Sequence, residues 1–138
     1  PQCDVISINV PLTPQTDWLF NRELYRMKKG RYLVNTARGR IVDRDALVEV
    51  LEQGHLAGYA GDVWYPQPAR SDHPWRNMPN HAMTPHVSGT TLEAQKRYAD
   101  GIRDCLTRFF EERPLDRDYL IVDGGKVISP SYSYAYEK

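Results

Sequence analysis

The sequence lacks several features that would assign a function directly. Its 138 residues include two cysteines, Cys3 and Cys105, which are too few and too far apart for a disulfide framework. No apolar run approaches the roughly 20 residues that a membrane-spanning helix needs. The 18 basic and 18 acidic side chains cancel, so no net field attracts nucleic acid or an anionic membrane. We therefore expect no nucleic-acid or membrane partner, and two thiols without a secretory signal favour a cytoplasmic location.

Two further absences concern cofactors. The sequence has no Gly-x-Gly-x-x-Gly turn to hold the phosphates of a dinucleotide, since Gly58 and Gly61 have the wrong spacing and lie in a predicted strand. The four histidines lack metal-ligand spacing and no cysteine pair joins them, so we expect no metal site. The chain also starts directly in a predicted strand. We expect it to be the C-terminal part of a longer protein, with any phosphate-binding turn upstream of Pro1.

Apolar periodicity predicts strands that alternate with helices. The predicted strands are 4–9, 31–35 and 57–63, and a short strand is expected at 119–122 in the tail. One helix is expected from the N-cap Asn21 to Gly30, and another from the N-cap Asp43 to Gly54. A capping box at 90–93 opens a long amphipathic helix that ends near 113–114. Strands separated by helices imply a parallel sheet with right-handed crossovers, which is half of a doubly wound α/β fold.

The stretch Leu33–Gly39 carries the first candidate functional residue. Asn35 and Thr36 end the strand with side chains that form local hydrogen bonds, and Gly39 turns the backbone where a Cβ would clash. Arg38 therefore follows the carboxyl end of a strand, where ligands bind in open α/β sheets. Its guanidinium is a rigid fork of donors that matches a carboxylate. A surface arginine that caps a loop is the alternative.

Three more polar residues fall where the same edge of the sheet is expected. Asp62 ends the third predicted strand, and His86 lies in the Pro-His-Val-Ser-Gly loop before the long helix. Gln67 lies between two prolines in the irregular loop 64–79, whose length and tryptophans favour a functional loop over disorder. Taken singly, His86 and Gln67 are more often structural than catalytic. Their combination with Arg38 is what indicates a ligand site.

Four segments together resemble the NAD-dependent D-2-hydroxyacid dehydrogenase family, and within it the formate dehydrogenases more closely. They are 58–64, 66–68, 72–76 and 83–91, and the resemblance extends from about residue 3 to about residue 119. It implies NAD as cofactor, formate as the small-molecule substrate and a homodimer. It also implies that residues 1–90 form the second half of a Rossmann-like NAD-binding domain. Residues 91–138 would be a long crossover helix and a tail that packs on a substrate domain.

The resemblance also implies roles for individual residues. Arg38 would hold the substrate carboxylate, with His86 beside the substrate and Gln67 next to the histidine. In the wider family an acidic residue at position 67 pairs with the histidine to handle the proton of a substrate hydroxyl. Formate has no hydroxyl, so the amide favours formate. The implied cofactor-binding residues are Pro11, Thr13, Thr36, Ala37, Arg38, Asp62, His86, Ser88 and Gly89.

Two of these implied contacts carry more detail. Asp62 would accept a hydrogen bond from the nicotinamide carboxamide. Relatives often carry histidine where this sequence has Thr13, which departs from the family pattern at the adenosine side.

Three alternatives stay open at this point. The chain could belong to a D-2-hydroxyacid dehydrogenase with an unusual amide at position 67. It could instead belong to a non-catalytic relative that senses NAD. A third alternative is that the chain by itself is inactive, because it lacks the phosphate-binding turn and the substrate domain.

Overall fold

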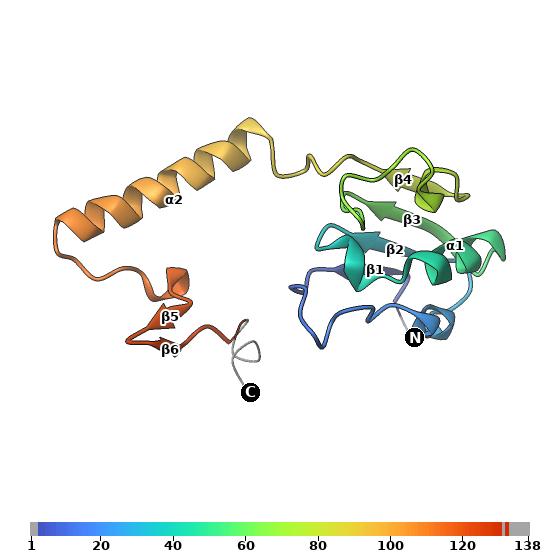
Figure 1. Cartoon of the computed structure of the whole chain (residues 1–138), viewed down its shortest axis with the longest axis horizontal. Helices are drawn as coiled ribbons and strands as arrows, with labels where there is room; N and C mark the ends of the chain where they lie inside the picture. Colours follow the sequence, from blue (N-terminus) through green and yellow to red (C-terminus); the bar gives the residue numbers. More distant parts are fainter. Residues whose placement is uncertain (1–2, 131, 133–138) are drawn as a thin grey trace. The chain divides into compact units, whose positions relative to one another are not determined.

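The computed structural model describes residues 3–130 and 132. The chain divides into two compact units, Pro1–Ser88 and Gly89–Lys138 (Figure 1). Assignment of the second unit to a crossover helix and substrate-domain tail stays a prediction. No helix in the described part of the chain is both long and apolar enough to cross a membrane.

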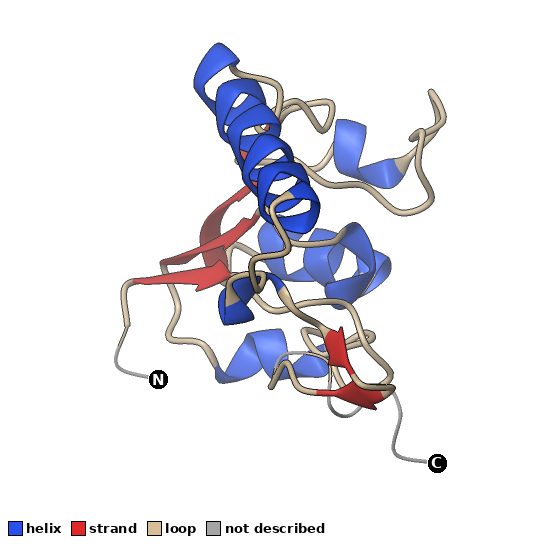
Figure 2. Cartoon of the chain, turned by 90° about the vertical axis from the view of Figure 1, so that its left-hand side faces the viewer, coloured by secondary structure: helices blue, strands red, loops and turns tan. Residues whose placement is uncertain are grey.

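The first unit is built on a four-stranded parallel sheet, drawn as red arrows in Figure 2. The strands are β1 (Val5–Ile8), β2 (Arg31–Asn35), β3 (Leu56–Gly61) and β4 (His81–Met83). They lie in the order β1-β2-β3-β4, and each neighbouring pair is parallel. This confirms the predicted parallel α/β sheet. The sequence does not predict β4, because three residues without a β-branched side chain carry too little pattern.

The helices of this unit are only partly as predicted. Helix α1 (Arg44–Glu52) begins as expected, since Asp43 Oδ1 accepts hydrogen bonds from Asp45 N at 3.0 Å and Ala46 N at 2.9 Å. The helix predicted from Asn21 to Gly30 is wrong, because only the short 3₁₀ turn η1 (Arg22–Arg26) forms there. Phe20 bridges to Val42 on one side of this segment, and β2 starts on the other. The few residues between them suit a connecting 3₁₀ turn rather than an α-helix.

The core of the first unit lies on one face of the sheet, where α1 and the 3₁₀ turns pack. Along β2, Leu33 is fully buried while its neighbour Tyr32 is 52% exposed, as strand alternation requires. Two further 3₁₀ turns, η2 (Gly39–Ile41) and η3 (Pro74–Arg76), bring large side chains into this core. The largest fully buried side chains are those of Trp75, Leu24, Leu33, Ile41, Leu47, Leu51 and Leu56.

The second unit consists of a long helix and a small hairpin. Helix α2 (Leu92–Phe110) is capped by Thr91, whose Oγ1 accepts from Ala94 N at 3.2 Å. The predicted capping box at 90–93 is therefore wrong by one residue, which places Ala94 rather than Glu93 at the third helical position.

The tail contains two short strands rather than one. After the 3₁₀ turn η4 (Arg117–Tyr119), strand β5 (Val122–Asp123) pairs antiparallel with β6 (Lys126–Val127). Gly124 and Gly125 both have positive φ, which a two-residue hairpin turn of type I′ requires. The strand predicted at 119–122 is wrong, since residue 119 lies in η4 and only residue 122 of this range belongs to a strand. Most of the tyrosine- and serine-rich end lies outside the described residues.

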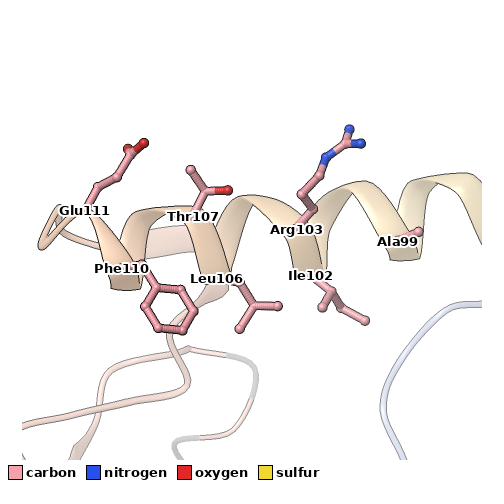
Figure 3. Close-up of a pocket in the computed structure, with 7 residues that line it drawn as sticks. All are labelled: Ala99, Ile102, Arg103, Leu106, Thr107, Phe110 and Glu111. Atoms are coloured by element: carbon pink, nitrogen blue, oxygen red, sulfur yellow. The ribbon is translucent and has the colours of Figure 1, made fainter.

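Helix α2 has one apolar face and no buried residue. Figure 3 shows Ile102, Leu106 and Phe110 on one side of the helix, with Thr107 on the opposite side. Phe110 is 79% exposed and Ile102 is 62% exposed. An apolar stripe of this size on an exposed helix is typical of an interaction surface.

We expect this stripe to cause self-association or dye binding of the 138-residue chain. The double variant Ile102→Glu/Phe110→Glu should remove both, because it charges the apolar face. Thr107→Glu, on the opposite side, should leave both unchanged. Sedimentation velocity and the fluorescence of a hydrophobic dye measure the two effects. A monomeric wild type that binds no dye would contradict the prediction.

Candidate functional site

All the candidate residues of the first unit follow the carboxyl ends of its strands. Because β1 to β4 are parallel, those ends lie along one edge of the sheet, where ligands bind in this type of fold. Pro11 and Thr13 come after β1, and Arg38 comes after β2. Asp62 comes directly after β3, and His86 comes after β4. The four loops at this edge are hereafter called the carboxyl edge.

The turn that carries Arg38 is held by a buried amide. Asn35 is fully buried, and its Nδ2 donates to Arg38 O at 2.9 Å while its Oδ1 accepts from Ala37 N at 3.0 Å. This confirms the predicted local hydrogen bonding of Asn35. Arg38 itself is exposed, and one of its guanidinium nitrogens donates to Ala37 O at 2.7 Å. The turn thus presents a guanidinium from a rigid base.

Gly39 allows the loop after β2 to pack against the loop after β3. A Cβ on Gly39 would lie 2.4 Å from the carbonyl carbon of Trp64 and 2.8 Å from the amide nitrogen of Tyr65. Backbone cannot move away as the end of a flexible side chain can. The clash predicted from the sequence is confirmed, and its cause is this close approach of two backbones.

The structure brings Gln67 and His86 together. Gln67 Oε1 lies 2.9 Å from His86 Nδ1, and both residues are exposed. Because an amide oxygen only accepts hydrogen bonds, Nδ1 carries the proton in this arrangement. His86 has a φ of +61°, a left-handed conformation that is uncommon outside glycine and is often found at functional sites. Gln67 lies between Pro66 and Pro68, and the peptide bond before each proline is cis.

Asp62 holds the loop that contains His86. Asp62 is 2% exposed, and its carboxylate accepts hydrogen bonds from Thr84 Oγ1 at 2.5 Å, Val87 N at 2.9 Å and Ser88 N at 2.9 Å. The Ser88 hydroxyl donates to it as well. Burial raises the pKa of Asp62, but these hydrogen bonds outweigh burial and hold the pKa well below its usual range. Asp62 is therefore charged at neutral pH.

The sequence did not reveal this role of Asp62. The four hydrogen bonds occupy about as many acceptor sites as a carboxylate has. The predicted contact of Asp62 with a nicotinamide carboxamide stays a prediction, as does the predicted cofactor contact of Ser88. A signal was present, since Thr84 and Ser88 place hydroxyl groups on both sides of the Pro-His pair.

Three other cofactor candidates lie after β1, after β2 and at the start of the second unit. Thr13 is buried, and its Oγ1 accepts from Gln15 N and Thr16 N at 3.1 Å each, so it stabilises its own turn. Thr36 is exposed directly after β2. Gly89 begins the second unit. Among the described residues, no three His, Cys, Asp or Glu side chains are grouped so that they could hold a metal ion.

Residues 1–88 match the family model described as D-isomer specific 2-hydroxyacid dehydrogenase, NAD binding domain. The chain belongs to the D-isomer specific 2-hydroxyacid dehydrogenase family. The match covers the whole first unit, so the carboxyl edge lies within the part of the chain that resembles the NAD-binding domain of this family.

Within the family, the chain is similar to formate dehydrogenases. It is 55% identical to the formate dehydrogenase of Pseudomonas sp. (strain 101), covering 100% of this chain and 34% of the relative. It is 56% identical to the mitochondrial formate dehydrogenase of Hordeum vulgare, covering 90% of this chain and 33% of the relative.

A solved structure supports the same placement. The NAD-dependent formate dehydrogenase from Staphylococcus aureus in complex with NAD matches with a TM-score of 0.75 and 62% identity. The match covers 89% of this chain and 38% of that one. The chain thus spans about a third of the length of these relatives.

We expect Asp62→Asn to lower the free energy of unfolding by about 2 kcal/mol at pH 7, because an amide nitrogen would face donors that now bind a carboxylate oxygen. The pKa of Asp62 is depressed in the folded state, so its stabilisation is present above the unfolded pKa of about 3.9 and is lost as the pH falls below it. The difference between wild type and variant should therefore shrink in acid. Denaturant unfolding at several pH values measures it.

Asp72→Asn is the matched control for this prediction. Asp72 pairs with Arg70 at the surface, where its side chain is 70% exposed, and such pairs contribute little. A difference between wild type and Asp62→Asn that stays constant from pH 7 to pH 3 would contradict the expectation.

Proposed function

We propose that this chain supplies Arg38, Gln67 and His86 to the active site of an NAD-dependent formate dehydrogenase. The observation that carries the proposal is the 2.9 Å hydrogen bond between Gln67 Oε1 and His86 Nδ1 at the carboxyl edge. It places a neutral amide, rather than a carboxylate, beside the imidazole. The similarity to formate dehydrogenases supports the same substrate.

The neutral pair fits a reaction that moves no proton through the enzyme. When formate is oxidised, its C–H bond breaks and the hydrogen leaves with the electron pair, so that carbon dioxide remains. A hydroxyacid also loses a hydroxyl proton, which needs a base such as a histidine assisted by a carboxylate. Gln67 accepts a hydrogen bond from His86 without adding negative charge. The pair can therefore orient His86 beside the substrate without preparing it as a base.

Arg38 is suited to hold the formate carboxylate. Its guanidinium offers parallel N–H donors that match two carboxylate oxygens, and Asn35 fixes the turn that presents it. As the hydride departs, negative charge leaves the carboxylate. A preorganised donor set thus needs to orient the substrate more than to hold charge.

The carboxyl edge also fits the nicotinamide end of a dinucleotide. Thr36 is exposed and Ala37 is small, so the end of β2 leaves room for a flat ring next to Arg38. Thr36, Ala37 and Ser88 are the residues of this unit that we propose to line the cofactor. NAD, when bound, supplies the hydride acceptor. The Gly-x-Gly-x-x-Gly turn that would bind the phosphates of NAD is not among the motifs of this sequence.

Location and assembly are part of the same proposal. We propose a cytoplasmic location, which the two free cysteines, Cys3 and Cys105, support. The Hordeum vulgare relative is named as mitochondrial. The homodimer is implied by the family resemblance. Because the chain spans about a third of its relatives, we propose that turnover requires the complete enzyme.

The test is a substrate comparison with the complete enzyme. We expect reduction of NAD with formate and little or none with lactate or glycerate of D configuration. Turnover of hydroxyacids but not formate would replace the proposal by a hydroxyacid dehydrogenase. Binding of NAD without turnover of either class would indicate a sensing relative.

We expect Arg38→Lys in the complete enzyme to lower kcat/KM for formate at least about a hundredfold, because a point charge cannot replace the two-pronged donor. Arg26→Lys is a suitable control, since Arg26 forms an exposed ion pair with Glu23. Near-native turnover of Arg38→Lys in steady-state kinetics would remove Arg38 from the site.

The variant Gln67→Glu tests the neutral pair. A carboxylate at position 67 would favour the charged imidazolium of His86, so activity should follow the titration of the coupled pair and become more dependent on pH. The measurement is kcat/KM for formate against pH, which reports the free enzyme. Gln53→Glu, at the end of α1, adds the same charge elsewhere. Superimposable profiles of wild type and Gln67→Glu would show that residue 67 does not control His86.

A further inference from the structure

His73 lies in a segment of the family resemblance, residues 72–76, to which the proposed function gives no role. His73 is 5% exposed, and its ring packs edge-on against two tryptophans, Trp64 at 5.4 Å and Trp75 at 5.3 Å between ring centroids. A polar ring in such a place needs partners for both nitrogens. Each nitrogen has one, and the two partners belong to different parts of the loop 64–79.

The hydrogen bonds fix the tautomer of His73. Nδ1 lies 3.2 Å from Trp75 N and accepts its hydrogen, which caps the 3₁₀ turn η3. The other nitrogen must then carry the proton, and Nε2 lies 2.9 Å from Tyr65 O. The Nε2–H group of His73 therefore donates to the carbonyl of Tyr65. One ring thus connects the turn η3 to the residue two positions before Gln67.

Gln67 follows this anchored carbonyl with little freedom. Pro66 and Pro68 flank it, and a proline ring restricts the backbone φ angle. On the far side of Gln67, Arg76 donates to Ala69 O at 2.9 Å and to Arg70 O at 2.8 Å. The segment that carries Gln67 is therefore tied down before and after the glutamine.

The same cluster reaches the segment that carries His86. Trp64, against which His73 packs, donates its Nε1–H to Thr84 O at 2.8 Å, two residues before His86. The Arg76 guanidinium lies 5.2 Å from the centre of the Trp64 ring, a distance at which cation and ring attract. The supports of Gln67 and of His86 are therefore joined through one tryptophan.

We propose that His73 is a positioning residue, which acts through Tyr65 to hold the Gln67 amide against the His86 imidazole. This inference rests on the proposed function for its effect on catalysis. The hydrogen bond between Gln67 and His86 can be observed whether or not the enzyme turns over formate. His73 touches neither substrate nor cofactor in this proposal.

Two substitutions separate the two bonds of the ring. His73→Asn places an amide oxygen near the position of Nδ1, so it keeps the cap on Trp75 N but cannot reach Tyr65 O. His73→Gln places an amide nitrogen near the position of Nε2, so it keeps the link to Tyr65 O and loses the cap. His55→Asn is the matched control, because His55 Nε2 also contacts a backbone carbonyl, Met27 O at 2.9 Å, next to the start of β3 and away from the carboxyl edge.

The experiment combines nitrogen NMR of the His86 ring with kinetics of the complete enzyme. We expect His73→Asn to shift the Nδ1 signal of His86 and to lower kcat/KM for formate about tenfold, since small misplacements in a site are costly. His73→Gln and His55→Asn should leave the Nδ1 signal and kcat/KM close to wild type. In a Gln67→Ala background, His73→Asn should cause no further kinetic loss, because its effect passes through the amide.

The outcomes that overturn the inference are equally specific. An unchanged His86 Nδ1 signal in His73→Asn would do so, as would a kinetic loss that adds in full to that of Gln67→Ala. If His73→Gln is as damaging to the signal as His73→Asn, keeping the link to Tyr65 O does not preserve the Gln67–His86 pair, and the inference fails. If the enzyme does not oxidise formate, the proposed function fails, and the NMR comparison alone decides the role of His73.

Discussion

The shape of the carboxyl edge depends on the buried carboxylate of Asp62. A buried charge is costly unless it is hydrogen bonded, and every donor described for it comes from residues 84–88. Strand β4 has three residues and, within the described part of the chain, pairs with β3 alone, so the sheet by itself holds this segment weakly. The carboxylate extends the connection between β3 and β4 beyond the last ladder hydrogen bond. His86, with its left-handed backbone, directly precedes two residues whose amides this carboxylate holds.

At each part of the site, buried and exposed polar side chains have different roles. Buried polar side chains bind the backbone of the loops, and exposed side chains on those loops are available for chemistry. The buried supports are Asn35, Asp62 and His73, and the exposed side chains are Arg38, Gln67 and His86. The loops also contact one another directly, since Gly39 brings the backbone after β2 against the backbone after β3. The edge is therefore one connected structure rather than four independent loops.

The sequence predicts the parts of this structure that local patterns encode. Apolar runs located β1, β2 and β3, and Asp43 located the start of α1. Local patterns do not encode the partners of Asp62 and His73, because those hydrogen bonds join segments up to 26 residues apart. The helix predicted from Asn21 to Gly30 was wrong for a similar reason. The bridge between Phe20 and Val42, which are distant in sequence, leaves space for only the short turn η1. The pairing of Gln67 with His86 came from the family resemblance and not from spacing.

The exposure of Gln67 has a consequence for how substrate classes diverge on this fold. Its side chain is exposed and lies outside the core, so replacing it by an acid changes the charge beside His86 and leaves the core intact. Most destabilising substitutions act through buried groups, and here those groups lie in the supports. Evolution could therefore replace an acid by an amide at position 67 without a prior stabilising substitution elsewhere in the protein. Under the proposed function, selection can change substrate preference at this position at almost no cost in folding.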